Sequence, residues 1–164
     1  MSEPDRGTLL EILGAHTQTP DEVIFGVWAG YASLNPNGSK LFTLGKHGYS
    51  HTEHVEPTAM AARLAAGPRL RHPGRDYVLM RGALTEADMI PALLDDYGPT
   101  LWANLVWPDD RAWCVGSEID FDSTLVACSD ETATAIVSND LLEAFLVRPD
   151  DSLQFDADVI NGRR

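Results

Sequence analysis

The chain has 164 residues, 44% of them hydrophobic, and a formal net charge of −13 at pH 7. This length is typical of one domain that buries roughly two-thirds of the surface of its unfolded chain. The acidic balance argues against nucleic acid and anionic membranes as partners, because both are bound through basic patches. No apolar run approaches the ~20 residues of a membrane span, and the acidic N-terminal residues are unlike a secretory signal. With two cysteines, too few for a disulfide framework, we expect a cytoplasmic protein.

The first half of the chain alternates between helical and strand-like patterns. Apolar residues spaced three and four apart predict a helix over residues 8–16. Residues 19–22 have the composition of a capping box, which we interpret as one helical turn that runs into a strand at residues 23–30. Further along we expect a turn at 35–38, a short strand at 41–44 and a helix at 58–66, whereas residues 46–56 show no clear periodicity.

The second half is predicted to contain a strand at 76–82, a helix from Thr85 to Asp96, strands at 101–107, 111–121 and 125–128, and a helix capped by Ser129. The strand at 76–82 is apolar at nearly every position, which indicates burial on both faces. Turn residues at 108–110 predict an antiparallel hairpin between the strands on either side. Residues 139–147 fit a helix and a strand equally well.

Together these elements predict one α+β domain with a mainly antiparallel sheet and flanking helices. The tail at residues 148–164 is polar and is expected to fray. The predicted core contains Phe25, Val27, Val78, Leu93, Leu105, Trp113, Val115, Ile119 and Phe121.

Three carboxylates alternate along the predicted strand after Arg111. Glu118, Asp120 and Asp122 would lie on one face, opposite a face that carries Trp113 and Val115. Such a row is usually solvated, or protects a sheet edge against pairing, although carboxylates are also suitable ligands for Mg²⁺ or Ca²⁺. We therefore treat this acidic face as a candidate binding surface, with a divalent metal as the alternative.

The same residues match the pattern D-x-D-x-T, which resembles the first motif of haloacid-dehalogenase-type phosphatases. In that family the first Asp is the nucleophile and the second a general acid, and the motif lies near the N-terminus with a catalytic lysine downstream. Here the motif ends at Thr124, and no lysine follows it, since the lysines of the chain are Lys40 and Lys46. The context therefore argues against a phosphatase.

Three histidines form the most catalytic-looking cluster of the chain. His47, His51 and His54 are spaced as ligands on one face of a helix would be, which suits Zn²⁺ with an open fourth position. The glycines inside this segment argue against a helix, and a polar loop is the competing interpretation. If the histidines hold a metal, the chain is a metal-dependent hydrolase with Glu53 or Glu56 as its base.

The function that we favour from the sequence is a non-catalytic protein-interaction module. The net charge favours a basic protein partner through long-range attraction, and Trp28, Tyr31 and Trp102 are aromatic residues suited to a contact patch. We expect Cys114 and Cys128 to be reduced. If the chain reverses near Phe121, the two cysteine side chains would be neighbours. The sequence leaves the oligomeric state open.

Two segments resemble a family of uncharacterised bacterial proteins. They are W-A-G-Y at Trp28–Tyr31 and W-P-D-D-R-A-W-C-V at Trp107–Val115, which match the W-x-G-Y and W-P-x-D-R-A-W-C-V segments of that family. The resemblance implies no activity, cofactor or catalytic residue. It implies that residues 38–73, which include the three histidines, are a variable insertion. A more distant likeness to small α+β immunity-type domains, which bind toxins, is a further alternative.

Overall fold

The computed structural model describes residues 3–44, 50–90, 102–118 and 123–152. Its elements in chain order are α1 (Glu3–Ala15), β1 (Val23–Trp28), the 3₁₀ helix η1 (Ala32–Leu34), β2 (Ser39–Leu44), β3 (Ser50–Val55), α2 (Ala59–Ala65), β4 (Arg69–His72), β5 (Arg75–Gly82), the 3₁₀ helix η2 (Leu84–Met89), β6 (Leu105–Pro108), β7 (Trp113–Ser117), β8 (Thr124–Cys128) and α4 (Asp130–Val137). The prediction of an α+β domain with a mainly antiparallel sheet is confirmed.

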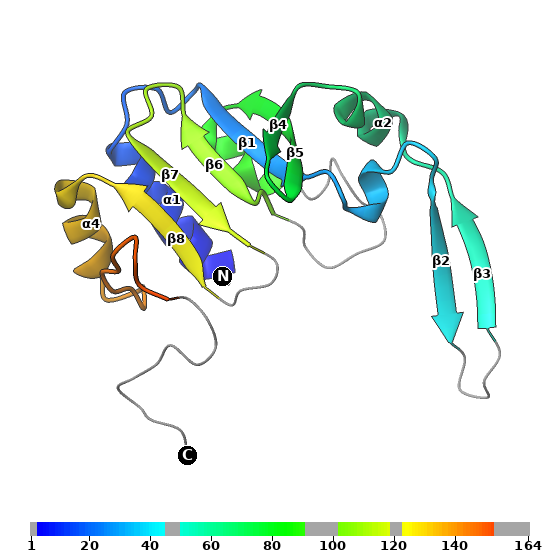
Figure 1. Cartoon of the computed structure of the whole chain (residues 1–164). Coiled ribbons are helices and arrows are strands. Elements are labelled where there is room, and N and C mark those ends of the chain that lie inside the picture. Colours follow the sequence, from blue (N-terminus) through cyan, green and yellow to red (C-terminus); the bar gives the residue numbers. More distant parts are fainter. Residues whose placement is uncertain (1–2, 45–49, 91–101, 119–122, 153–164) are drawn as a thin grey trace, which may run out of the picture.

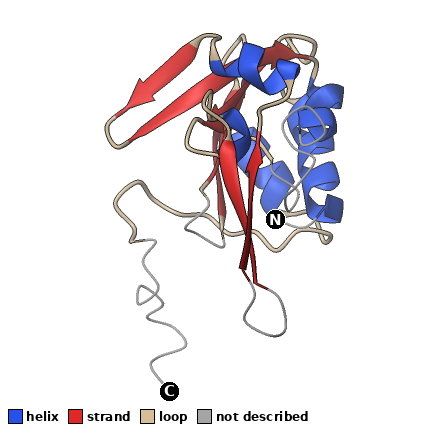
Figure 2. Cartoon of the chain, turned by 90° about the vertical axis from the view of Figure 1, so that its right-hand side faces the viewer, coloured by secondary structure: helices blue, strands red, loops and turns tan. Residues whose placement is uncertain are grey.

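Six strands form one antiparallel sheet in the order β4-β5-β1-β6-β7-β8, while β2 and β3 form a separate hairpin. The hairpin projects away from the sheet, as Figure 1 shows. Helices α1 and α4 lie on the same side of the sheet (Figures 1 and 2). Within the described part of the chain, no helix is long and apolar enough to cross a membrane.

The core fills the space between the helices and one face of the sheet. Strand β1 places Val23, Phe25 and Val27 there because alternate side chains of a strand point to the same face. These residues pack with Leu9 and Leu13 of α1. The indole Nε1 of buried Trp113 donates a hydrogen bond of 2.8 Å to the carbonyl oxygen of Leu13. This bond joins α1 directly to strand β7.

The predicted core is confirmed where the structure describes it, with one exception. Phe25, Val27, Val78, Trp113 and Val115 are buried. Leu105 is only partly buried, and it lies on the other face of the sheet because it pairs with Gly26 rather than with a core-facing residue. The remaining members, Leu93, Ile119 and Phe121, lie outside the described residues.

Several elements begin or end where their sequence signals indicated. The hydroxyl of Ser129 accepts a hydrogen bond from a backbone N–H group in the first turn of α4, as its predicted capping role requires, and Thr58 caps α2 in the same way. Strands β6 and β7 form the predicted hairpin, and β8 pairs with β7 as the third strand. Helix α1 begins earlier than predicted, at Glu3.

Other elements correct the sequence prediction. Strands β3 and β4 were missed because their sequences, SHTEHV and RLRH, lack an apolar alternation. The 3₁₀ helix η2 begins at Leu84 after Ala83, so Thr85 is not its cap, and residues 91–101 of the predicted helix lie outside the described part. Strand β5 is fully buried only at Tyr77 and Val78. Residues 143–148 form neither helix nor strand.

The two cysteines are free, as expected, but their predicted proximity is wrong. Cys114 pairs across the β7–β8 hairpin with Ala127, whereas Cys128 pairs with Trp113. The positions differ by one residue in register, and a shift of one residue places side chains on opposite faces of a sheet. Cys114 therefore faces away from the helices, while Cys128 packs against the core.

Candidate functional site: the open face of the sheet

The side of the sheet that faces away from the helices is covered by no helix or strand among the described elements, and we call it the open face (Figures 1 and 2). Paired residues of an antiparallel sheet project to the same side. One row of paired residues therefore crosses five strands of the open face, in the order Leu79, Gly26, Leu105, Gly116 and Leu125. Leucine and glycine alternate along this row, so that ridges and gaps alternate on the surface.

The two glycines of the row have different surroundings. A Cβ atom at Gly26 would lie 3.2 Å from the Cβ of Leu105 and 3.5 Å from the Cδ2 of Leu79, so these leucines close over the gap. A Cβ atom at Gly116 would meet only the Cδ2 of Leu105, at 3.9 Å, which is an ordinary contact. A side chain at position 26 would therefore be crowded by Leu105 and Leu79, whereas position 116 has room for one.

The space at position 116 is a hollow of about 200 Å³. It is lined by Tyr77, Asn104, Leu105, Gly116, Ser117, Glu118, Ser123 and Leu125. We call it the Gly116 hollow. Leu105 and Leu125 form its two walls on the neighbouring strands, and Leu125 is 40% exposed. The hollow is smaller than the roughly 300–1,000 Å³ of a pocket for a drug-sized ligand.

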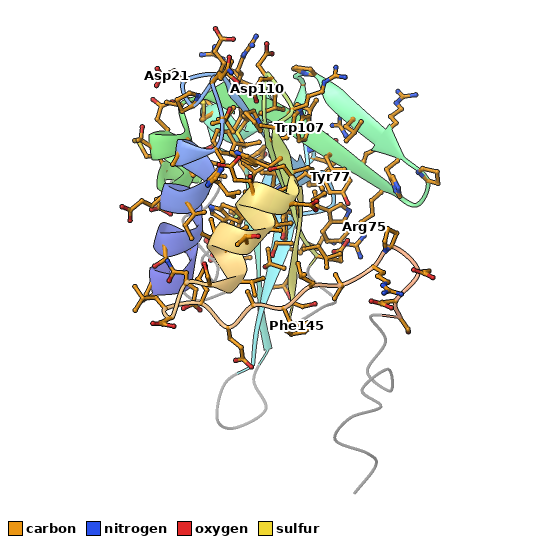
Figure 3. All side chains as sticks on the ribbon, turned by 90° about the vertical axis from the view of Figure 1, so that its left-hand side faces the viewer. Asp21, Arg75, Tyr77, Trp107, Asp110 and Phe145 are labelled. Atoms are coloured by element: carbon orange, nitrogen blue, oxygen red, sulfur yellow. The ribbon has the colours of Figure 1, made fainter. Side chains whose placement is uncertain are left out.

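An ion pair borders the hollow on the side of strand β5. Arg75 donates a hydrogen bond to the carboxylate of Glu118, which follows β7 in the chain. Figure 3 shows Arg75 and Tyr77 on the side of the sheet that faces away from α1 and α4. Burial, followed by the nearby charge of Glu118, raises the pKa of Tyr77, while Arg75 lowers it in part. The phenol therefore stays protonated at neutral pH and can donate a hydrogen bond.

Asn104 fixes the backbone at the other side of the hollow. Its side-chain oxygen accepts a hydrogen bond of 2.8 Å from the N–H of Trp28, and its side-chain nitrogen donates one of 3.1 Å to the carbonyl oxygen of Ser117. The side chain is buried and hydrogen-bonded at both ends. We therefore assign Asn104 a structural role, because its polar atoms are already engaged.

Two of the three predicted contact aromatics lie together. The rings of Trp28 and Tyr31 pack edge to face with centroids 5.4 Å apart, and the guanidinium of Arg75 lies 5.0 Å from the Trp28 ring centroid. A Cβ atom at Gly30 would clash with the Trp28 ring, so a larger residue here would displace that ring. Trp102 has a different neighbour, since Arg6 of α1 lies over its ring at 5.8 Å.

Only one residue of the predicted acidic face lies in the described structure. Glu118 is close to the open face as predicted, but it is paired with Arg75 and its side chain is 27% exposed. The residues that precede it on that side of β7, Cys114 and Gly116, are apolar. Asp120 and Asp122 lie outside the described residues, so their binding role stays a prediction.

The predicted metal site is described only at its third histidine. His47 and the side chain of His51 lie outside the described part of the chain, and His54 is 2.9 Å from the carboxylate of Glu56. Residues 50–55 form a strand, so the helical spacing that would align three rings does not apply to this segment. Among the described residues, no group of three His, Cys, Asp or Glu side chains is placed to hold a metal ion. Zinc binding by the cluster stays a prediction, and comparing the Zn²⁺-induced melting shift of the wild type and His54→Ala tests it.

Sequence reasoning missed the Gly116 hollow. The signal was present as a glycine inside an alternating strand, which often marks the close approach of another group. The sequence alone does not distinguish Gly116 from Gly26, because the difference depends on neighbours from other strands.

Comparison with known proteins adds no further assignment, since no family model, no curated protein and no solved structure matches the chain. The resemblance to the family with the W-x-G-Y segment therefore stays a prediction.

Proposed function

We propose that the chain is a non-catalytic protein-interaction module whose open face binds a partner protein. One bulky apolar side chain of the partner enters the Gly116 hollow between Leu105 and Leu125. The observation that carries this proposal is Gly116 itself. A glycine inside a strand costs roughly 0.5–1 kcal/mol relative to alanine, and no packing contact of the described structure requires one at this position. A ligand that needs the space accounts for that cost.

The size and surroundings of the hollow support a protein partner over a small molecule. Its volume of about 200 Å³ suits one anchoring side chain, and binding energy in protein interfaces is concentrated in such buried anchors. Leu105 and Leu125 flank the hollow, the polar residues Ser117, Glu118 and Ser123 complete one side of its lining, and the Arg75–Glu118 pair lies at its border. This combination of an apolar centre and a polar rim is the usual anatomy of an interface. A cytoplasmic location is part of the same proposal.

The experiment compares partner binding by the wild type and by Gly116→Val, which fills the hollow from within. Proteins captured from lysate are identified, and each candidate is then purified and titrated against both chains by calorimetry. We expect the variant to fold normally and to bind the true partner about tenfold more weakly or worse. Glu11→Gln on the exposed side of α1 is the matched control and should bind like the wild type. Equal binding by Gly116→Val would contradict the proposal.

A further inference from the structure

The last described residues of the chain lie on the same side of the sheet as the open face. Helix α4 lies on the covered side, and Figure 2 shows the loop after it passing the end of the sheet to the opposite side. In Figure 3 this loop continues beyond Phe145 on the side that carries Arg75. Leu142 and Ala144 pack against the core, so the loop starts from a fixed point of the body.

A turn closes this loop shortly before the described part ends at residue 152. The backbone N–H of Arg148 donates a hydrogen bond of 2.7 Å to the carboxylate of Asp151. The N–H of Asp151 in turn donates one of 3.0 Å to the carbonyl oxygen of Arg148, which is the bond of a β-turn. A β-turn reverses the chain, so the residues that follow start beside the open face.

The sequence that follows has the pattern of a half-buried strand. Apolar residues occupy every second position of residues 153–159, which we call the terminal segment. They are Leu153, Phe155, Ala157 and Val159, and they alternate with the polar residues Gln154, Asp156 and Asp158. Strict alternation is typical of an extended chain with one side on an apolar surface and the other in water. The terminal segment therefore needs an apolar surface within its reach.

The open face offers such a surface at a matching length. An extended chain spans about 3.3 Å per residue, so residues 153–159 reach across roughly 20 Å. Neighbouring strands lie about 4.8 Å apart, so the leucine–glycine row from Leu79 to Leu125 has nearly the same length. The row ends at the edge strand β8, directly beside the Gly116 hollow, and β8 leads into α4 and the loop after it.

From these observations we infer that the terminal segment is an intramolecular ligand of the open face. Its apolar side lies on the leucine–glycine row, and Phe155, its bulkiest side chain, enters the Gly116 hollow. Phe145 is not that side chain, since it is 76% exposed in the described structure. A partner protein must then displace the segment, so the chain controls access to its own binding surface. This inference rests on the proposed function, because it takes the hollow as the site of one bulky apolar side chain.

The test titrates a fluorescent synthetic peptide of residues 150–164 against the full chain and its Phe155→Asp variant. We expect the variant to bind the peptide at micromolar concentrations, because its own segment no longer fills the hollow. The wild type should bind about tenfold more weakly or worse, because its attached segment competes at a high effective concentration. A peptide that carries Phe155→Asp is the matched control and should not bind.

Two further variants locate the contact. Adding Gly116→Val to Phe155→Asp should abolish peptide binding, and melting curves establish that each variant is folded. Leu125→Asp, on the exposed wall of the hollow, tests the same contact if Gly116→Val destabilises the chain. Peptide binding that is absent in every variant, or equal for the wild type and Phe155→Asp, would overturn the inference.

Sedimentation and partner binding separate the remaining outcomes. The wild type should be monomeric, and a dimer weakened by Phe155→Asp would overturn the inference by showing that the segment binds a second copy. If no variant binds the peptide but Gly116→Val loses a foreign partner, the proposed function stands and only the terminal segment is wrong. If the peptide binds as expected but Gly116→Val retains every foreign partner, the segment is the ligand of the hollow and the proposed function fails.

Discussion

The two faces of the six-stranded sheet use the same strands in different ways. On the covered face, Phe25, Val106 and Val115 pair across β1, β6 and β7 and are almost completely buried beneath helices. One residue along each strand, the open face has Gly26, Leu105 and Gly116 in the corresponding row. The covered row is filled with branched side chains, while the open row contains gaps.

This difference separates folding from binding on one sheet. Side chains on the covered face are packed between two layers, so their removal leaves cavities that destabilise the protein. On the open face, Leu125 is partly exposed and the side chains around the hollow at Gly116 are not packed beneath a second layer, so changes there affect stability less. We therefore expect substitutions on the covered face to lower the free energy of unfolding. Substitutions on the open face should weaken partner binding and change stability less.

The largest effect is expected from Trp113→Ala on the covered face. The substitution removes a fully packed side chain and the hydrogen bond of 2.8 Å that joins β7 to Leu13 of α1. We expect a loss of about 3–5 kcal/mol in the free energy of unfolding. Urea denaturation followed by circular dichroism measures it, with Leu125→Ala on the open face as the control. A similar loss for both variants would remove the distinction between the faces.

The second prediction compares the two glycines of the open row. Gly26→Val places methyl groups against Leu105 and Leu79 and should cost about 1–3 kcal/mol of stability. Gly116→Val enters free space, removes the flexibility of a strand glycine and should gain roughly 0.5–1 kcal/mol. Thermal and urea denaturation of both variants give the values. The comparison fails if Gly116→Val destabilises the chain as much as Gly26→Val does.

The cysteines provide a probe of each face. Burial raises the pKa of Cys114, and burial together with Asp130 raises the pKa of Cys128, so both thiols are largely protonated at neutral pH. We expect iodoacetamide to modify both more slowly than free cysteine in the native protein and completely after denaturation. A bound partner should further protect Cys114, which lies on the open face, and leave Cys128 unchanged. Mass spectrometry measures the rates. Thiols that resist alkylation after denaturation would show that they are not reduced.

The smallest effect is expected at the turn between β6 and β7. The carboxylate of Asp110 accepts hydrogen bonds from the N–H of Gln18 and the hydroxyl of Thr17, at 2.7 and 2.9 Å, which ties the turn to the loop after α1. The bond from the N–H of Gln18 has the largest part in lowering the pKa of Asp110 below its usual value of 3.8. A lowered pKa in the folded state gives stability that is present above the unfolded value and lost as the pH falls through the folded value.

Asp110→Asn should therefore reduce stability slightly at neutral pH, and the difference from the wild type should shrink in acid below about pH 3.8. The effect is small because the carboxylate is exposed. Denaturation curves at several pH values measure it, and Glu11→Gln, which removes an exposed carboxylate of α1, is the control. A difference that stays constant across this acidic range would show that the charge of Asp110 is not what matters.

The sequence by itself determined the local features of this protein. The cap at Ser129, the turn between β6 and β7 and the alternation from Trp113 to Glu118 depend on residues close together in the chain. Short-range hydrogen bonds and the two-residue period of a strand were sufficient to predict them. The fold class followed from the number and kind of these elements.

The remaining features depend on contacts between residues that are distant in sequence, so only the tertiary structure decided them. The sheet places β1 between β5 and β6, and this order brings Leu79 and Leu105 together over Gly26. Strands β3 and β4 exist through pairing and not through an apolar pattern of their own. A shift of one residue in the β7–β8 register separates the two cysteines. Gly26 and Gly116 are the same residue type on the same face of the sheet. Only the packing around them makes Gly26 a structural position and Gly116 a candidate binding site.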